Sequence, residues 1–219
     1  MEAARSAEPR APAPGLRARN KQDKLRRIVA AAAERFSTAG FEATTAREIS
    51  RRAGIGTGTL FTYVRDKREL LFLVFEADAL RLLDEAEAAA ARRGRVVEAL
   101  LALFGPFIDF YATRPELSRL FARELFFRRP EETHGMEALS WRLAGAVAQV
   151  LARGVEQGEL RADLPRGTAA AAVLAQYSFW IQRWLGAEAV AHEAVPRGLR
   201  AGLELLLDGM RKEEGPHGS

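Results

Sequence analysis

Hydrophobic residues recur along most of the chain at intervals of three and four, the spacing that gathers them on one face of an α-helix. No stretch of useful length alternates apolar and polar residues with the period of two that marks a half-buried β-strand. The pattern therefore predicts an all-α fold of about nine helices. Glycines, prolines and capping residues set their approximate limits, at residues 23–39, 45–53, 57–63, 66–91, 96–113, 115–127, 136–157, 165–185 and 196–211.

The second of these helices has a well-defined N-terminal signal. Thr45 and Glu48 form an S/T-x-x-E capping box, in which each side chain accepts a hydrogen bond from a free backbone N–H group of the first turn. Gly54 follows as a turn, and a short third helix begins near Thr57. Two short helices separated by a glycine turn are typical of a helix-turn-helix, so residues 45–64 are predicted to form one.

Charge is distributed unevenly between the two ends of the chain. Residues 1–75 carry 15 Lys or Arg against 8 Asp or Glu, a net of +7, whereas residues 76–219 carry 18 against 21, a net of −3. A basic N-terminal third is expected of a surface that faces phosphate groups, although a solvated face with a basic tail gives the same composition. Arg17, Arg19 and Lys21 form either an arm that reaches the DNA backbone or minor groove, or a disordered extension.

Composition also argues against several kinds of chemistry. The chain has no cysteine, which excludes disulfides, thiolate metal sites and cysteine nucleophiles. Its three histidines are scattered and pair with no nucleophile or carboxylate at a diagnostic spacing, so we expect neither an enzyme nor a bound cofactor. Glu131, Glu132 and His134 could ligate a metal, but an exposed polar loop is the favoured interpretation. With no signal peptide and no apolar run of transmembrane length, we expect a cytoplasmic protein without membrane contact.

Residues 22–75 resemble the DNA-binding domain of the TetR family of bacterial transcriptional regulators. The shared pattern is F-x-x-x-G-F-x-x-T-T-x-x-x-I-x-x-x-A-G-I-x-x-G-T-L-F-x-Y-V-x-x-K-x-x-L, at fixed spacing and without insertion. It is carried by Phe36, Gly40, Phe41, Thr44, Thr45, Ile49, Ala53, Gly54, Ile55, Gly58, Thr59, Leu60, Phe61, Tyr63, Val64, Lys67 and Leu70.

The resemblance implies contacts with double-stranded DNA at the matching positions. The N-terminus of the second helix can hold a phosphate, and Arg47 in its first turn can reach a guanine edge or a phosphate. The third helix would enter the major groove, where Gly58 admits close approach of the backbone to DNA. Lys67, at the start of the fourth helix, would bind the phosphate backbone. The predicted DNA-binding residues are Thr45, Arg47, Thr57, Gly58, Thr59, Thr62, Tyr63 and Lys67.

The recognition helix departs from the family pattern in two places. Phe61 stands where a tyrosine is frequent, so a phosphate-binding hydroxyl is missing and Phe61 is interpreted as a packing residue. Gly56 stands where a capping serine is common. The helix also lacks Arg, Asn and Gln, so base recognition would depend on hydroxyl and methyl contacts together with Arg47.

The resemblance also implies a domain organisation. Residues 1–20 and 213–219 are expected to be disordered tails, residues 21–75 the DNA-binding domain, and residues 76–212 a helical effector-binding and dimerisation domain. In the family the last two long helices pair with their copies in a homodimer that reads a palindromic operator. Here the last helix has a stripe of Leu199, Leu203, Leu206 and Met210, which either makes that contact or packs within one chain.

Aromatic side chains gather in the middle and late helices. Most such residues belong to a core, but a few polar residues among them are compatible with a pocket for a small, largely apolar effector that releases a repressor from DNA. The candidate pocket residues are Phe107, Tyr111, Phe121, Trp141, Gln149, Tyr177 and Trp180. The alternative function is a helical small-molecule-binding or adaptor protein without specific DNA recognition.

Overall fold

The structure, a computed structural model, describes residues 15–127, 136–186 and 190–211. Within these ranges the chain forms nine α-helices and no strand, apart from an isolated bridge between Leu160 and Arg211. The prediction of an all-α fold is confirmed. The helices are α1 (Leu16–Ala39), α2 (Ala46–Ala53), α3 (Thr57–Leu60), α4 (Lys67–Ala91), α5 (Val96–Thr113), α6 (Pro115–Phe127), α7 (Met136–Glu156), α8 (Arg166–Leu185) and α9 (Ala194–Asp208).

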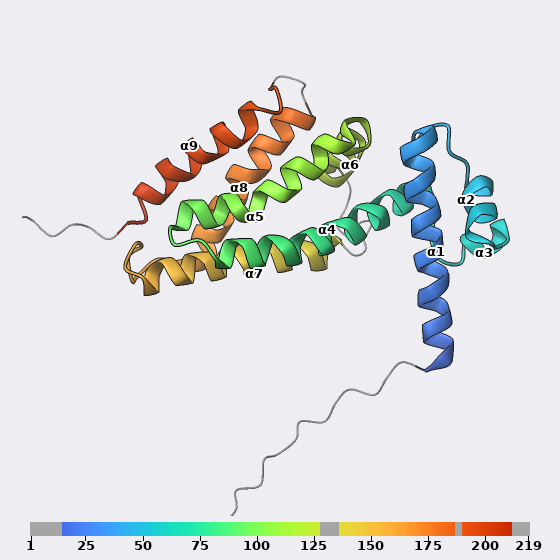
Figure 1. The fold of residues 1–219 in the computed structure, drawn as a ribbon, viewed down its shortest axis with the longest axis horizontal. Helices are drawn as coiled ribbons and strands as arrows, with labels where there is room; N and C mark the ends of the chain where they lie inside the picture. Colours follow the sequence, from blue (N-terminus) through green and yellow to red (C-terminus); the bar gives the residue numbers. More distant parts are fainter. Residues whose placement is uncertain (1–14, 128–135, 187–189, 212–219) are drawn as a thin grey trace, which may run out of the picture.

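The first three helices pack with the start of α4 into an N-terminal unit, which lies at one end of the molecule (Figure 1). Ile28 and Phe36 of α1, Ile49 of α2 and Leu60 of α3 are each at most 3% exposed and form its core. Gly54 ends α2 with a φ of 67°, a left-handed conformation that costs glycine little. This turn gives α3 a direction different from that of α2, as a helix-turn-helix requires.

Helix α4 belongs to both parts of the molecule. Its N-terminus is capped by Asp66, whose carboxylate accepts a 2.7 Å hydrogen bond from the backbone N–H of Glu69. From there α4 runs 25 residues into the body, which comprises α4 to α9, and packs there against α5, α6 and α7 (Figure 1). A continuous helix therefore connects the two parts.

Helix α5 lies at the centre of the body, in contact with α4, α7 and α9. Its 18 residues are long and apolar enough to cross a membrane, with a mean hydropathy of 1.5, but the packing identifies it as a core helix of the body. The helix continues through Pro106, a residue that removes one backbone hydrogen bond from a helix interior. Phe104 and Phe107 on either side are buried, and we attribute the continuity to this packing, which offsets the lost backbone hydrogen bond.

Two arginines tie the outer helices of the body to its centre. Arg142 of α7 forms ion pairs with Asp84 and Glu87 of α4. Arg200 of α9 forms a two-armed ion pair with Glu98 of α5, at 2.7 and 3.2 Å. Because each pair connects helices far apart in sequence, it fixes the relative position of two elements that apolar packing alone leaves free to slide.

Helices α8 and α9 approach each other closely. A Cβ atom added at Gly198 of α9 would lie 2.2 Å from the ring of Trp180 on α8, too close for any other residue. Leu199, Leu203 and Met210 of the predicted stripe are buried within the chain. Of the two interpretations offered for this stripe, packing within one chain is therefore the one that the structure supports.

The main boundary difference is at the start of α1. The sequence predicted a disordered tail to residue 20 and a helix from Asp23, but the helix begins at Leu16. Arg17 and Arg19 therefore lie on an exposed helical extension and not on a flexible arm. Residues 16–22 contain good helix formers and no glycine or proline, so nothing in them stops the helix. The first 14 residues, and the loop with Glu131, Glu132 and His134, lie outside the described residues.

Candidate nucleic-acid interface

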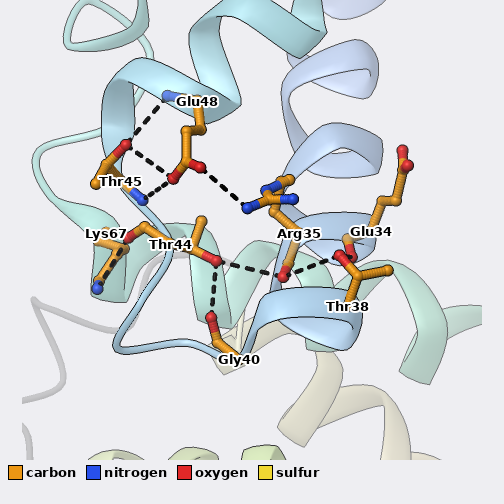
Figure 2. A network of polar contacts seen from close by, with 8 residues as sticks. All are labelled: Glu34, Arg35, Thr38, Gly40, Thr44, Thr45, Glu48 and Lys67. Atoms are coloured by element: carbon orange, nitrogen blue, oxygen red, sulfur yellow. Dashed lines mark hydrogen bonds and ion pairs between the residues drawn. The ribbon is translucent and has the colours of Figure 1, made fainter.

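The N-terminus of α2 is held by the predicted capping box (Figure 2). The Thr45 hydroxyl accepts from the Glu48 backbone N–H at 3.2 Å, and the Glu48 carboxylate accepts from the Thr45 backbone N–H and hydroxyl, both at 2.9 Å. Arg35 of α1 donates to the other carboxylate oxygen of Glu48 at 3.0 Å. The hydrogen bonds from Thr45, with a smaller contribution from the charge of Arg35, lower the pKa of Glu48. The start of α2 is thus fixed to α1.

The hydroxyl of Thr45 is therefore already used inside the protein. Its proton is donated to Glu48 and its oxygen accepts the Glu48 N–H, so the predicted phosphate contact depends on the backbone at the start of α2. Thr44, which the sequence analysis named only as part of the motif, is 1% exposed. Its hydroxyl donates to the carbonyl of Gly40 at 2.7 Å and lies 3.3 Å from the carbonyl of Arg35. Thr44 thus closes the α1–α2 loop, residues 40–45.

Lys67 requires a correction. The sequence analysis predicted a phosphate contact, but its ammonium donates to three backbone carbonyls of the α1–α2 loop, those of Phe41, Thr44 and Glu42, at 2.8, 3.1 and 3.2 Å. The same Nζ lies 4.4 Å from the centre of the Phe41 ring. Because an ammonium has three N–H groups, none remains for a phosphate in this arrangement. The tertiary fold creates these contacts between residues more than 20 positions apart, and local sequence did not indicate them.

The remaining predicted residues lie around α3. Thr57 and Gly58, at the start of α3, and Arg47, in the first turn of α2, are exposed. Arg47 has no ion-pair partner among the described residues, so its guanidinium is available to a partner molecule. Thr59 is half-buried.

The last predicted residues follow α3 in a turn, because α3 ends at Leu60 and not near Tyr63 as the sequence suggested. The Thr62 hydroxyl donates to the Thr59 carbonyl at 2.7 Å and keeps only its acceptor capacity. Tyr63 packs partly against the core, with its ring half-buried.

Phe61 also requires a correction. It was interpreted as a packing residue, yet its side chain is 51% exposed, between Leu60, which is buried, and Thr62, which is exposed. The short length of α3 explains the difference, since the chain turns after Leu60 and directs the next side chain outward. An exposed aromatic ring beside Thr62 can contact a thymine methyl group or a sugar. The departure from tyrosine was visible in the sequence, but the exposure was not.

The candidate pocket residues of the body divide into two groups. Phe107, Phe121 and Tyr177 are at most 8% exposed. The ring of Phe121 stacks on Phe75 with centroids 4.1 Å apart, and that of Tyr177 stacks on Phe104 at 4.5 Å. These residues are packed aromatic core.

Tyr111 and Tyr177 add a polar pair to this core. Their phenol groups are hydrogen-bonded to each other, and burial raises the pKa of both. Trp141 is 72% exposed on α7 and lies outside the packed core. Gln149 is also exposed on α7 and borders a hollow of about 300 Å³ together with Glu87 of α4 and Leu103 of α5. Trp180 is half-buried against Gly198.

An open cavity lies elsewhere, between the N-terminal unit and the body. It has a volume of about 1,020 Å³ and is bordered by the end of α1, the α1–α2 loop, α6 and the end of α8. Figure 1 shows the end of α1 near α6 and the start of α4. Its apolar lining includes Phe36, Phe41, Leu117, Leu120 and Leu185, and its polar lining includes Glu42, Glu116, Arg119, Arg123 and Gln182.

Comparison with known proteins agrees with this architecture. Residues 28–74 match the family model described as bacterial regulatory proteins, tetR family. The match spans most of α1, the whole of α2 and α3, and the start of α4, which together make up the N-terminal unit.

Solved structures extend the similarity over the body. FadR of Thermus thermophilus, a TetR-family transcriptional repressor solved in complex with lauroyl-CoA, is 28% identical, with a TM-score of 0.70 over 89% of this chain and 98% of that one. FadR of Bacillus subtilis, solved with stearoyl-CoA, is 18% identical, with a TM-score of 0.67 over 85% of this chain and 100% of that one. The ketosteroid regulator KstR2 of Mycobacterium tuberculosis is 22% identical, with a TM-score of 0.52 over 86% of this chain and 96% of that one.

Proposed function

Because this chain belongs to the TetR family of bacterial transcriptional regulators, we propose that it is a dimeric repressor that leaves its operator when an acyl thioester of coenzyme A binds. The observation that supports DNA binding is the exposure of Arg47, Thr57 and Gly58. These residues lie in the first turns of α2 and α3. The capping box and the Arg35–Glu48 ion pair hold this surface in place before DNA arrives, so little ordering entropy is lost on binding.

Arg47 is the residue to which we assign base or phosphate recognition. It stands in the first turn of α2, exposed and without an ion-pair partner among the described residues. Arg52, also on α2, is by contrast paired with Glu34 of α1. A guanidinium that is not neutralised within the protein is the group that can form two parallel hydrogen bonds to guanine or to a phosphate.

A dimer is supported by exposed apolar side chains on α8 and α9. Phe179 of α8 is 51% exposed and Leu205 of α9 is 77% exposed. Ala171 and Ala175 of α8 and Ala201 of α9 are exposed at the four-residue spacing that places them on the same helix faces. An apolar face of two adjacent helices, left uncovered in the single chain, fits a two-fold contact with a second copy.

The proposed effector class is supported by the relative that is 28% identical over most of the chain and is complexed with lauroyl-CoA. The cavity between the N-terminal unit and the body has the size of a small-molecule site and a lining of apolar groups with a few charged ones. We place the protein in the cytoplasm, where both DNA and acyl thioesters are found, and assign it no catalytic role.

Fluorescence anisotropy with the DNA that flanks the protein's own gene tests the proposal. We expect specific binding that weakens as salt rises, because counterions are released from the phosphates, and release of the DNA on addition of lauroyl-CoA. Arg47→Ala is expected to lower specific affinity at least tenfold, whereas Arg81→Ala, which removes an exposed arginine on α4, serves as a control. Weak binding that ignores sequence would instead favour a helical ligand-binding or adaptor protein.

A further inference from the structure

The cavity between the N-terminal unit and the body touches the elements that hold the start of α2. Phe41 lines the cavity, and its ring lies 5.0 Å from that of Phe36, which also lines it. Phe41 is also bound by Lys67, through its carbonyl oxygen at 2.8 Å and through its ring. A molecule in the cavity would therefore press on a residue that Lys67 holds.

A second hollow, of about 390 Å³, adjoins the first. It shares Phe41, Glu42, Leu120 and Arg123 with the cavity, and Lys67 also lines it. Phe41 and Leu120 thus contribute to both hollows, one from the α1–α2 loop and the other from α6. An elongated ligand can extend from the cavity into the hollow by passing between the loop and α6.

The lining indicates the chemistry of the ligand. Phe36, Leu117 and Leu185 offer an apolar surface for an alkyl chain. Arg119 and Arg123 lie one helical turn apart on α6, with Arg123 3.9 Å from the carboxylate of Glu124, and both are exposed, so their planar guanidinium groups can exchange protein contacts for phosphate oxygens. The class that combines both features is an alkyl chain joined to a phosphorylated head group.

We propose that this cavity is the regulatory site, which takes the acyl thioester of coenzyme A with its alkyl chain against Phe36, Leu117 and Leu185 and its phosphates at Arg119 and Arg123. The assignment rests on the proposed function, because it takes the effector class from there. It places the effector at the junction of the two parts of the molecule and not in the aromatic core around Phe121, Tyr111 and Tyr177, where the rings are packed against one another.

The path from this site to the DNA-reading surface is short. Lys67 donates to the carbonyls of Phe41 and Thr44. Figure 2 shows the contact with Thr44, which precedes Thr45, the cap of α2. When a ligand displaces Phe41, the ammonium of Lys67 loses its contacts with the Phe41 ring and the Phe41 carbonyl. The α1–α2 loop, which positions the N-terminus of α2, is then released. Arg47, in the first turn of α2, then loses its fixed position. Lys67 acts in this path as a positioning residue.

Isothermal titration calorimetry with lauroyl-CoA, together with DNA binding in its presence, tests the site. Leu120→Trp, which fills the cavity, and Arg123→Glu, which reverses the charge at the head group, are expected to weaken lauroyl-CoA binding at least tenfold and to abolish release of DNA. Leu101→Trp, at a partly buried leucine of a surface hollow on α5, and Arg81→Glu are the matched controls and should behave as wild type. Laurate alone and coenzyme A alone should each bind more weakly than lauroyl-CoA, because each makes half of the contacts.

The outcomes separate this assignment from the proposed function. The cavity is not the site if wild type, Leu120→Trp and Arg123→Glu all bind lauroyl-CoA with equal affinity and all release DNA. That outcome would leave the effector class intact. Wild-type protein that binds its operator but responds to neither lauroyl-CoA nor laurate would overturn the effector class, and the site with it.

Lys67→Met tests the path. We expect lauroyl-CoA to bind more tightly to Lys67→Met than to wild type, because no contact of Lys67 with Phe41 has to break, while the DNA affinity without ligand falls to that of ligand-bound wild type. Added lauroyl-CoA should then change DNA binding little, and Lys67→Arg should restore part of the response. The path would be refuted if lauroyl-CoA lowered the DNA affinity of Lys67→Met by the same factor as it lowers that of wild type.

Discussion

The ammonium group of Lys67 lies 4.4 Å from the centre of the Phe41 ring and donates a 2.8 Å hydrogen bond to the carbonyl of the same residue. The two residues are 26 positions apart, one at the N-terminus of α4 and the other in the loop that leads to α2. A cation held by a ring and by three carbonyls at once is a structural clamp, and it joins α4, the connecting helix, to the loop that precedes α2.

This clamp predicts that Lys67→Met destabilises the protein. Removing the ammonium leaves three carbonyls without their charged donor, at a cost of about 1–3 kcal/mol. Thermal or urea unfolding measures the loss, and Arg81→Met at an exposed position of α4 is the control.

DNA binding of the same variant distinguishes the clamp from a phosphate contact. A lysine that binds phosphate contributes about one unit to the slope of log affinity against log salt, and a lysine that holds a loop contributes nothing. We therefore expect the Lys67→Met slope to equal that of wild type. A slope reduced by about one unit, with unchanged stability, would restore the phosphate contact predicted from the sequence.

Phe61 is predicted to be a DNA contact. With 51% of its surface exposed it contributes little to the core, so Phe61→Ala should leave the unfolding free energy within about 0.5 kcal/mol of wild type. Operator affinity should fall roughly 5- to 30-fold, the equivalent of about 1–2 kcal/mol of apolar surface buried against DNA. Phe61→Tyr should bind at least as tightly as wild type, because its hydroxyl can donate to a phosphate. A large loss of stability in Phe61→Ala with unchanged affinity would show a packing role.

Glu48 predicts a pH-dependent contribution to stability. Its pKa is lowered in the folded protein, first by the hydrogen bonds from Thr45 and then by Arg35, so the folded state favours the ionised form. The resulting stabilisation is present above the pKa of an unfolded glutamate, about 4.3, and is lost as the pH falls through the lower folded value. Glu48→Gln should lower Tm at pH 7, and the difference should shrink below pH 4.

Glu85→Gln is the control for this measurement, because Glu85 is an exposed glutamate of α4 paired with Arg81. Its Tm should differ little from wild type across the range. A Tm difference for Glu48→Gln that stays constant from pH 7 to pH 3 would contradict the assignment of the effect to the ionised carboxylate.

Leu205 is predicted to lie in the dimer interface. Leu205→Asp places a charge on the exposed face of α9 and should convert a dimer to a monomer in light scattering, with operator affinity reduced at least tenfold, since two half-sites no longer act together. Leu16→Asp is the matched control, because Leu16 of α1 is 76% exposed and Leu205 is 77% exposed. If both variants remain dimeric, the face of α8 and α9 is not the interface.

The sequence by itself determined the features that depend on neighbours along the chain. Helical periodicity, the prolines and the glycines indicated the nine helices found in the described part of the chain. The Thr45–Glu48 capping box formed as predicted because its partners are three residues apart. The fixed spacing of the motif likewise identified the family from a few dozen residues.

The tertiary structure alone decided which way side chains face and what they bind at long range. It committed Lys67 to the α1–α2 loop and exposed Phe61 and Trp141. It also paired Tyr111 with Tyr177, and it left a cavity where α1 meets α6. Periodicity gives a helix two or more faces but does not say which neighbour covers each one. That depends on contacts between elements distant in sequence, such as those of α4 with the α1–α2 loop, which form only when the chain is folded.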